Sequence, residues 1–188
     1  MEKQLKKELH KSGRKVKKDN KWIIEVIIVS FAISLVLSLV SELLLSNLPT
    51  AIGLILYLVI IFIGVIFDII GVSVTGADEA IFHSMNSRRI KGAKLAVRFK
   101  KNASKVSNFC CDVVGDVCGI ISGSIAVVLA TTLSEVLKVD LFIMIIIFSA
   151  ITASLTIGGK ALGKSYAINN SNLILFDFAK FVSNFYRK

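Results

Sequence analysis

The sequence predicts an all-α, polytopic membrane protein with four transmembrane helices and additional cytoplasmic interfacial helices. Of its 188 residues, 54% are hydrophobic and one is proline, and the apolar residues gather in four long runs. A helix needs about 20 such residues to cross the hydrocarbon layer, and only helices and closed barrels keep their backbone hydrogen-bonded there. The helices are expected at about 22–46, 51–75, 107–133 and 140–163.

The basic residues predict the orientation of these helices. The chain has 23 Lys and Arg against 13 Asp and Glu. All the basic residues but Lys138 precede Trp22, lie between Arg88 and Lys105, or follow from Lys160 onward. By the positive-inside rule, both termini and the connection 85–106 are expected to be cytoplasmic, in a multi-pass protein of the cytoplasmic membrane.

The same charge distribution indicates the surroundings of the protein. Basic segments next to membrane helices attract anionic lipid headgroups, which are the expected partner. No aromatic residues alternate with the N-terminal lysines as a base-stacking surface would require, so no nucleic-acid partner is expected.

Outside the four helices, the sequence divides into an arm and two amphipathic segments. Residues 1–21 form a basic cytoplasmic arm, and 22–188 form the transmembrane domain. The connection 85–106 has Ile90, Ala93 and Val97 on one side, and is expected to lie along the membrane surface. The tail 168–188 is also expected to be interfacial, with Ile174, Phe178, Phe181 and Phe185 opposite Asp177, Lys180, Asn184 and Lys188.

Charged residues within the apolar runs indicate the candidate site. An ionisable group at membrane depth costs several kcal/mol (about 3 or more) unless it is paired or faces water. Carboxylates and other oxygens are the ligands that Mg²⁺ prefers, and Mg²⁺ often uses only one or two carboxylates. One interpretation is therefore a cation site or pathway, and the other is an Asp–Lys pair that holds helices together. The candidate metal ligands are Asp68, Asp112, Asp116, Asn108, Ser122 and Thr156, and Lys160 is the candidate ion-pair or gating residue.

Two groups of glycines lead to structural expectations. Gly115, Gly119 and Gly123 form a small-residue stripe, which predicts a close helix contact within a protomer or across a dimer axis. Gly158, Gly159 and Gly163, near the end of the fourth helix, are expected to loosen or break it and to free carbonyls around a cavity.

Four short motifs resemble the transmembrane domain of CorB/CorC/CNNM-type magnesium and cobalt transporters. The matching segments are 76–80 (GADEA), 86–90 (NSRRI), 115–116 (GD) and 159–167 (GKALGKSYA), in the family's order. The resemblance covers about residues 55–185. The family's CBS pair and C-terminal domain have no counterpart in these 188 residues.

The resemblance implies a homodimer that binds or transports divalent cations, with Mg²⁺ the expected ion. Asp116 stands where the family has asparagine, and Lys160 where it has glutamate. This charge exchange would let the Lys160 ammonium group take the electrostatic role of a bound cation, leaving when the ion enters. The alternative is a non-transporting scaffold or interaction protein in which Lys160 pairs permanently with Asp112 or Asp116. No enzyme is expected, because the motifs of intramembrane catalysis are absent.

Overall fold

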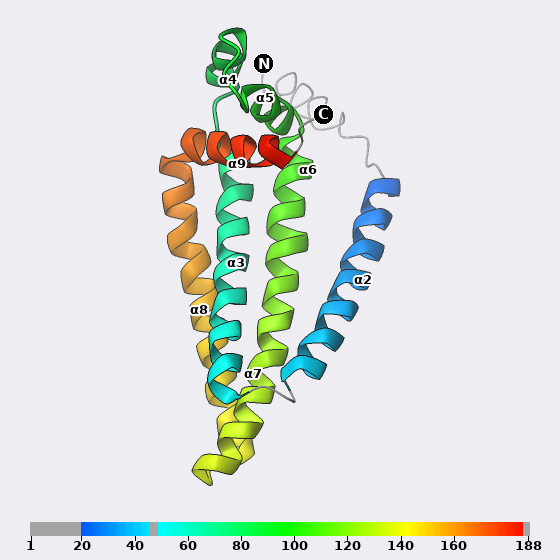
Figure 1. The fold of residues 1–188 in the computed structure, drawn as a ribbon, viewed down its shortest axis with the longest axis vertical. Coiled ribbons are helices and arrows are strands. Elements are labelled where there is room, and N and C mark those ends of the chain that lie inside the picture. The colour runs from blue at the N-terminus through cyan, green and yellow to red at the C-terminus, as the bar shows by residue number, and fades with distance from the viewer. Residues whose placement is uncertain (1–19, 46–48, 186–188) are drawn as a thin grey trace, which may run out of the picture.

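The protein is a bundle of long helices with smaller helices across one end. A computed structural model describes residues 20–45 and 49–185, and every regular element within them is a helix. In Figure 1, α2, α3, α7 and α8 run along the long axis, α9 crosses one end, and α4 and α5 lie beyond α9. The all-α prediction is confirmed, whereas most of the predicted arm lies outside the described residues. The elements are α2 (Asn20–Leu45), α3 (Thr50–Gly76), α4 (Glu79–Ser87), α5 (Ala93–Lys101), α6 (Ala103–Asn108), the π-helical segment η1 (Phe109–Gly115), α7 (Asp116–Leu137), α8 (Leu141–Asn169) and α9 (Ser171–Phe185).

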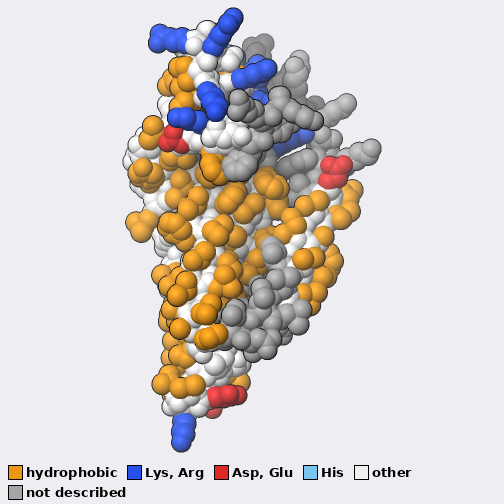
Figure 2. All heavy atoms as spheres, in the orientation of Figure 1, with side chains coloured by type: hydrophobic (Ala, Val, Ile, Leu, Met, Phe, Trp, Pro, Cys, Tyr) orange, Lys and Arg blue, Asp and Glu red, His pale blue; other side chains and the backbone are white. Residues whose placement is uncertain are grey.

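In the part of the chain that the structure describes, three helical stretches are long and apolar enough to cross a membrane. They are Thr50–Gly76 (α3), Ala103–Leu137 (α6, η1 and α7) and Leu141–Asn169 (α8). Figure 2 shows hydrophobic side chains over the long flank of the molecule, and Lys and Arg side chains mainly at the end where α4 and α5 lie. These features indicate a multi-pass membrane protein. In α2, which has 26 residues, the described apolar segment is Ile27–Val36, and a fourth crossing stays a prediction.

The core of the bundle lies between α3 and α7. Tyr57 and Ile61 of α3 are buried against aliphatic side chains of α7, among them Ile121 and Ile125. A buried hydrogen bond of 2.8 Å joins the Tyr57 hydroxyl to Oγ1 of Thr152 on α8. Since the Thr152 hydroxyl donates to the carbonyl of its own helix at residue 148, the Tyr57 hydroxyl is the donor. The rest of α8 is mostly exposed, as expected for a helix that faces lipid.

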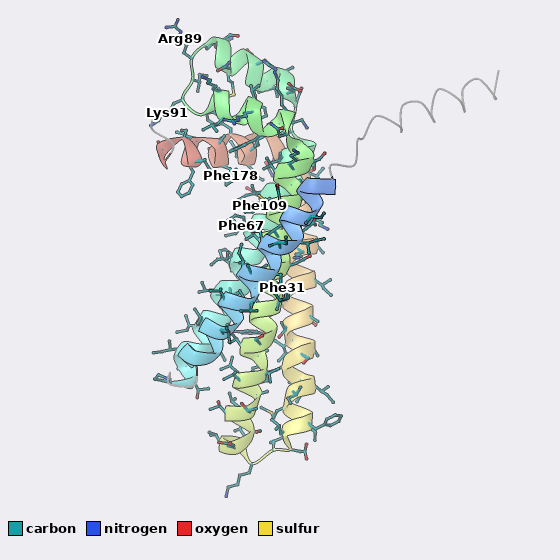
Figure 3. The ribbon with its side chains drawn as sticks, turned by 90° about the vertical axis from the view of Figure 1, so that its right-hand side faces the viewer. Phe31, Phe67, Arg89, Lys91, Phe109 and Phe178 are labelled. Carbon is teal, nitrogen blue, oxygen red and sulfur yellow. The ribbon has the colours of Figure 1, made fainter. Side chains whose placement is uncertain are left out.

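Helices α4, α5 and α9 form a helical cap over one end of the bundle. Phe82 of α4, Ala96 of α5 and Leu175 of α9 are completely buried in one cluster with Val74 at the end of α3. This cluster covers most of the apolar side of the connection 85–106, because α5 packs on α9 and α4: Ala93 and Val97 are buried, whereas Ile90 is 39% exposed. The position of the connection along the membrane surface stays a prediction. In Figure 3 the turn between α4 and α5 carries Arg89 at the outer tip of the cap.

The tail forms the predicted amphipathic helix, but a different face of it is buried. Leu175 and Ala179 are completely buried against the rest of the cap, whereas Phe181 is 61% exposed. Because α9 packs between the end of α3 and α5, its contact face is set by these neighbours and not by the largest apolar side chains. The interfacial position of the tail, with Phe181 toward lipid, stays a prediction.

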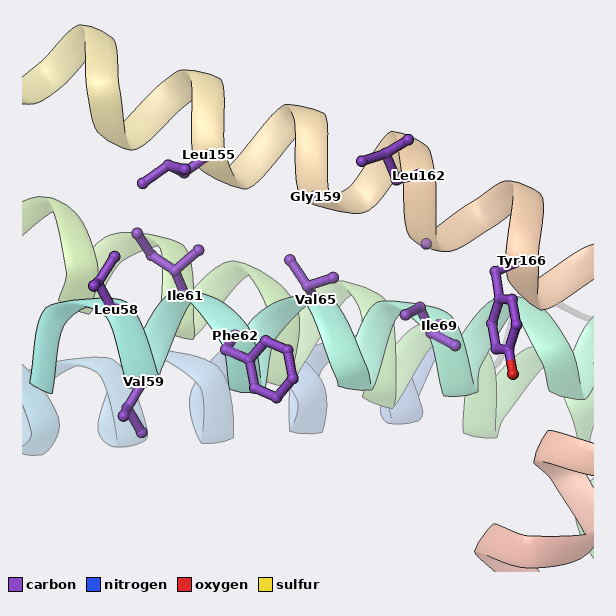
Figure 4. Close-up of a pocket in the computed structure, with 11 residues that line it drawn as sticks. Leu58, Val59, Ile61, Phe62, Val65, Ile69, Leu155, Gly159, Leu162 and Tyr166 are labelled. Carbon is purple, nitrogen blue, oxygen red and sulfur yellow. The ribbon is translucent and has the colours of Figure 1, made fainter. Parts of the chain in front are cut away.

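The glycines near the end of the fourth helix do not break it. α8 continues through them to Asn169, beyond the predicted end at 163. A Cβ on Gly159 would lie 2.9 Å from Cγ2 of Val65, and one on Gly163 would lie 2.6 Å from Cγ1 of Ile69. Figure 4 shows Val65 and Ile69 reaching from α3 toward α8 at this contact. The glycines serve close helix packing, and α8 stays helical through them. They also line an open apolar groove of about 700 Å³ between α3 and α8, which Figure 4 shows.

Candidate functional site at a buried carboxylate

Gly64, Asp68, Gly71 and Thr75 form a stripe along α3 whose spacing predicts that it faces protein. The first three are buried, whereas Thr75 at the end of the stripe is exposed. A Cβ on Gly64 would lie 3.0 Å from the Cβ of Cys118 on α7. A Cβ on Gly71 would overlap Sγ of Cys111 and would lie 3.1 Å from the carbonyl oxygen of Ser107. The two glycines therefore let α3 approach the third membrane-spanning stretch closely. Asp68, between them on the same face of α3, is held at this contact.

Asp68 is the buried acid among the side chains that the structure describes. It is 4% exposed, and its Oδ2 atom has no hydrogen-bond partner among the described residues. The Sγ atom of Cys111 donates a weak hydrogen bond of 3.6 Å to the Asp68 backbone carbonyl, not to the unpartnered Oδ2. An unsatisfied buried polar atom is uncommon, and an ionised carboxylate is among the most costly groups to leave so. Asp68 therefore needs a compensating cation or proton.

A π-helical segment lies opposite this acid. Phe109–Gly115 follows α6 without a break and leads directly into α7, and α3 packs along it. Pairing of residue i with i+5 instead of i+4 widens the helix, and such segments in other proteins are frequently found at functional sites. This segment was not predicted, because residues 107–133 were expected to form one regular α-helix and no residue pattern distinguishes a π-helical segment from an α-helix.

Lys160 pairs with Asp116. Its Nζ atom lies 3.3 Å from Oδ1 of Asp116, joining α8 to the beginning of α7. The Asp116 side chain is 66% exposed and that of Lys160 is 22% exposed. A Cβ built on Gly115 would lie 3.6 Å from the Lys160 Nζ atom. It would also lie 3.8 Å from the carbonyl oxygen of Gly64 on α3. Lys160 thus extends from the Asp116 side toward the contact between α7 and α3.

The other predicted ligands lie in different surroundings. Asp112 and Asn108 are exposed. Ser122 is completely buried, and its hydroxyl donates a 2.9 Å hydrogen bond to the carbonyl oxygen of Gly119. Oγ1 of Thr156 is buried without a hydrogen-bond partner among the described residues.

The three predicted aspartates do not form one cluster. Within residues 20–45 and 49–185, no group of three or more His, Cys, Asp and Glu side chains is placed to hold a metal ion. Asp68 is buried at the α3 contact, whereas Asp112 and Asp116 are exposed on the third stretch. Their convergence was predicted from depth alone, which does not fix the direction that each side chain takes around its helix.

The three glycines of the predicted stripe, Gly115, Gly119 and Gly123, do not share one environment. Gly115 lies in the close contact described above, but a Cβ on Gly119 or Gly123 would meet nothing within 4 Å. Within the protomer, the predicted close contact is therefore limited to Gly115. The remaining glycines line an open groove beside α8.

The described residues form an all-helical protein with three helices able to cross a membrane, a carboxylate buried without a partner among them, and an Asp–Lys pair. No protein-family model, curated protein or solved structure matches the chain.

Proposed function

We propose that the protein is a CorB-like membrane protein that binds or transports a divalent cation, with Mg²⁺ the expected ion. The observation that carries the proposal is Asp68, which is buried with one oxygen unpartnered among the described residues, beside a π-helical segment. A hard cation would compensate this charge, and Mg²⁺ commonly uses only one or two carboxylates while it keeps several waters. The separation of the three aspartates is therefore compatible with a site built on Asp68 alone.

The backbone opposite Asp68 can supply further oxygen ligands. A change from α-helical to π-helical pairing leaves a carbonyl oxygen without its usual intrahelical partner, and such oxygens suit a hard cation. In the proposal, Asp68 provides the charge and the η1 backbone provides neutral oxygens. Asp112, one residue of η1, would attract the ion toward this region from the exposed side.

Lys160 would regulate occupancy. Its ammonium group extends toward the contact of α7 with α3 while remaining paired with Asp116. A second positive charge at this contact opposes an entering cation, because charges interact strongly where water is scarce. Lys160 would therefore stay on the Asp116 side when the ion is bound.

In the proposed topology the protein crosses the cytoplasmic membrane four times. Both termini lie in the cytoplasm. Exposed basic side chains such as Arg88, Lys91 and Lys94 lie in the cap or its α4–α5 turn, and Lys138 follows α7 at the other end of the α7–α8 pair. The positive-inside rule then supports a cytoplasmic cap. In this arrangement α2 supplies the fourth crossing.

A permanent structural pair is the second candidate function. The 3.3 Å contact between Lys160 and Asp116 favours it, because a stable pair of this kind can hold α7 and α8 together in a scaffold or interaction protein. This candidate gives Asp68 no role in binding. The two functions therefore differ in what Mg²⁺ does to the folded protein.

The test compares Asp68→Asn with Asp177→Asn, which neutralises an acid of α9 away from the bundle. Mg²⁺ at about 100 times its dissociation constant stabilises a protein that binds it by about 2.7 kcal/mol. Purified wild type and Asp177→Asn should show this as a rise of several degrees in melting temperature, and Asp68→Asn should not. An equal response of all three proteins, or none in any, would leave the scaffold as the better account.

A further inference from the structure

Helix α5 of the cap carries a row of basic side chains, which we call the basic stripe. Lys94, Arg98 and Lys101 follow one another at intervals of four and three residues, so they lie on one face of α5, and all three are exposed. From the first to the last, the stripe is about 10 Å long. The turn that leads into α5 adds Arg89 and Lys91, which Figure 3 shows where α4 and α5 join.

No ion pair in the described part of the cap neutralises the basic stripe. Residues 78–105 contain eight Lys and Arg but two acids. Both acids are engaged by α4, because a carboxylate oxygen of Asp78 accepts a hydrogen bond from the Ala80 N–H and Glu79 contacts His83. None of the three stripe side chains has a hydrogen-bond or ion-pair partner among the described residues. The stripe is therefore a positive surface without internal compensation.

An open groove of about 300 Å³ lies beside the basic stripe. Its apolar lining comes from three helices, with Leu95 and Phe99 of α5, Val106 of α6 and Val182 of α9. Each of these four side chains is half-buried. Arg98 also lines the groove, so the stripe forms one of its edges. The cap thus presents a row of positive charges along an apolar groove.

We propose that the basic stripe and this groove together bind an acidic amphipathic helix of a cytoplasmic protein. Such a helix places its apolar face in a groove, and acidic residues at the edge of that face would lie against the stripe. The proposal rests on the cytoplasmic position proposed for the cap. It does not depend on cation binding, because Asp68 lies in the bundle at the contact of α3 with η1.

Charge excludes the chain itself as the occupant. A second copy would bring the same positive stripe, and the N-terminal segment 1–21 is itself rich in lysine. Like charges brought together at an interface are unfavourable. The acidic complement must therefore come from a different molecule.

Distance argues against the membrane as the occupant. α9 crosses the end of the bundle, and α5 packs on α9 on the side away from the bundle (Figure 1). Packed helices lie about 8–10 Å apart, and charges are largely screened beyond about 8 Å at physiological ionic strength. With α9 at the membrane surface, as its sequence predicts, the basic stripe is largely screened from the headgroups. Nucleic acid, in turn, lacks an apolar face for the groove to bury.

The test measures peptide binding to the full chain in nanodiscs of zwitterionic lipid at physiological salt. The probe is a synthetic peptide with glutamates along one side and leucines along the next, at helical spacing. Its control is a peptide of the same composition whose order is scrambled, so that it offers the charge without an apolar face. By fluorescence anisotropy, the ordered peptide should bind at least about tenfold more tightly. Equal affinities would overturn the proposal.

Charge-reversal variants then locate the binding surface. Lys94→Glu and Lys101→Glu should each weaken binding of the ordered peptide about five- to tenfold, because an attractive contact becomes repulsive. Lys138→Glu makes the same change in net charge at the other end of the bundle and should leave binding unchanged. Equal effects of all three variants would mean general attraction to a basic protein and would overturn the proposal. If a stripe variant fails to fold, the comparison of the two peptides on wild type still decides.

Two further measurements separate the other classes of partner. Adding an anionic lipid to the nanodiscs should change the affinity of the ordered peptide by less than about threefold, because the stripe is screened from the headgroups. Loss of peptide binding would place the stripe on the membrane and overturn the proposal. A single-stranded oligonucleotide of equal charge should bind no more tightly than the scrambled peptide. Binding as tight as that of the ordered peptide would favour nucleic acid and overturn the proposal as well.

Discussion

Gly71→Ala tests the contact that holds Asp68 in place. The added Cβ would overlap Sγ of Cys111 and would lie 3.1 Å from the Ser107 carbonyl oxygen and 3.2 Å from the Cβ of Cys110. The thiol can rotate away, but a carbonyl oxygen and a Cβ move only with their helix. Overpacking of this kind costs about 1–3 kcal/mol. Alanine also has a higher helix propensity than glycine, which offsets about 1 kcal/mol of that cost.

A second Gly→Ala variant controls for the higher helix propensity of alanine. Gly158 lies in the interior of α8, and a Cβ there would meet nothing within 4 Å. Gly158→Ala therefore gains the propensity without the overlap. The difference between the two variants should be the overpacking cost, about 1–3 kcal/mol, or about 2–12 °C in melting temperature for a chain of this size.

The assay is thermal unfolding of both variants in one detergent at one protein concentration. Gly71→Ala should melt below Gly158→Ala, and its Mg²⁺ response should be reduced because Asp68 is displaced together with α3. Equal melting temperatures would refute the reasoning. They would mean that α3 and η1 are not in the close contact on which the candidate site depends.

Three further predictions concern the ion pair, the topology and the cap. Lys160→Ala removes the competing cation, so millimolar Mg²⁺ should raise its melting temperature more than that of wild type; equal shifts would argue for a permanent pair. A cysteine at Val139 should be labelled only from outside intact cells and one at Asn184 only after permeabilisation, and the reverse would overturn the map. Lys100→Met should lower stability by about 1–2 kcal/mol relative to Lys94→Met in chemical unfolding, because the Lys100 Nζ atom donates a 2.8 Å hydrogen bond to the carbonyl of Thr75 at the end of α3. Similar stabilities would show that this bond contributes little.

Apolar length and small-residue spacing predicted much of the fold. The positions of α3, α7 and α8 follow from runs that only a helix can carry through a membrane, and Gly64, Asp68 and Gly71 do face protein as their spacing indicates. The ends of these helices were predicted less well. α8 passes through Gly163 because α3 packs against it, and such tertiary contacts are not encoded in local propensity.

The residues of the candidate site were predicted from the sequence, but the way in which their side chains are arranged was not. Lys160 does pair with one of the two named acids, Asp116, because the distance between stripes on neighbouring helices is short. The direction of Asp112 and the burial of Asp68 depend on the π-helical segment and on how α3 rotates against it. These features arise from packing between distant segments, and the periodicity of one helix contains no information about them.

The most direct test of the central claim is the position of a bound ion. A structure determined after Mn²⁺ has replaced Mg²⁺ would locate the metal by its anomalous scattering. The account predicts a peak within coordination distance of Asp68 Oδ2, facing Phe109–Gly115, with Lys160 turned toward Asp116. A fully occupied metal elsewhere, or no peak at millimolar Mn²⁺ with Asp68 compensated by the Lys160 ammonium group, would contradict it.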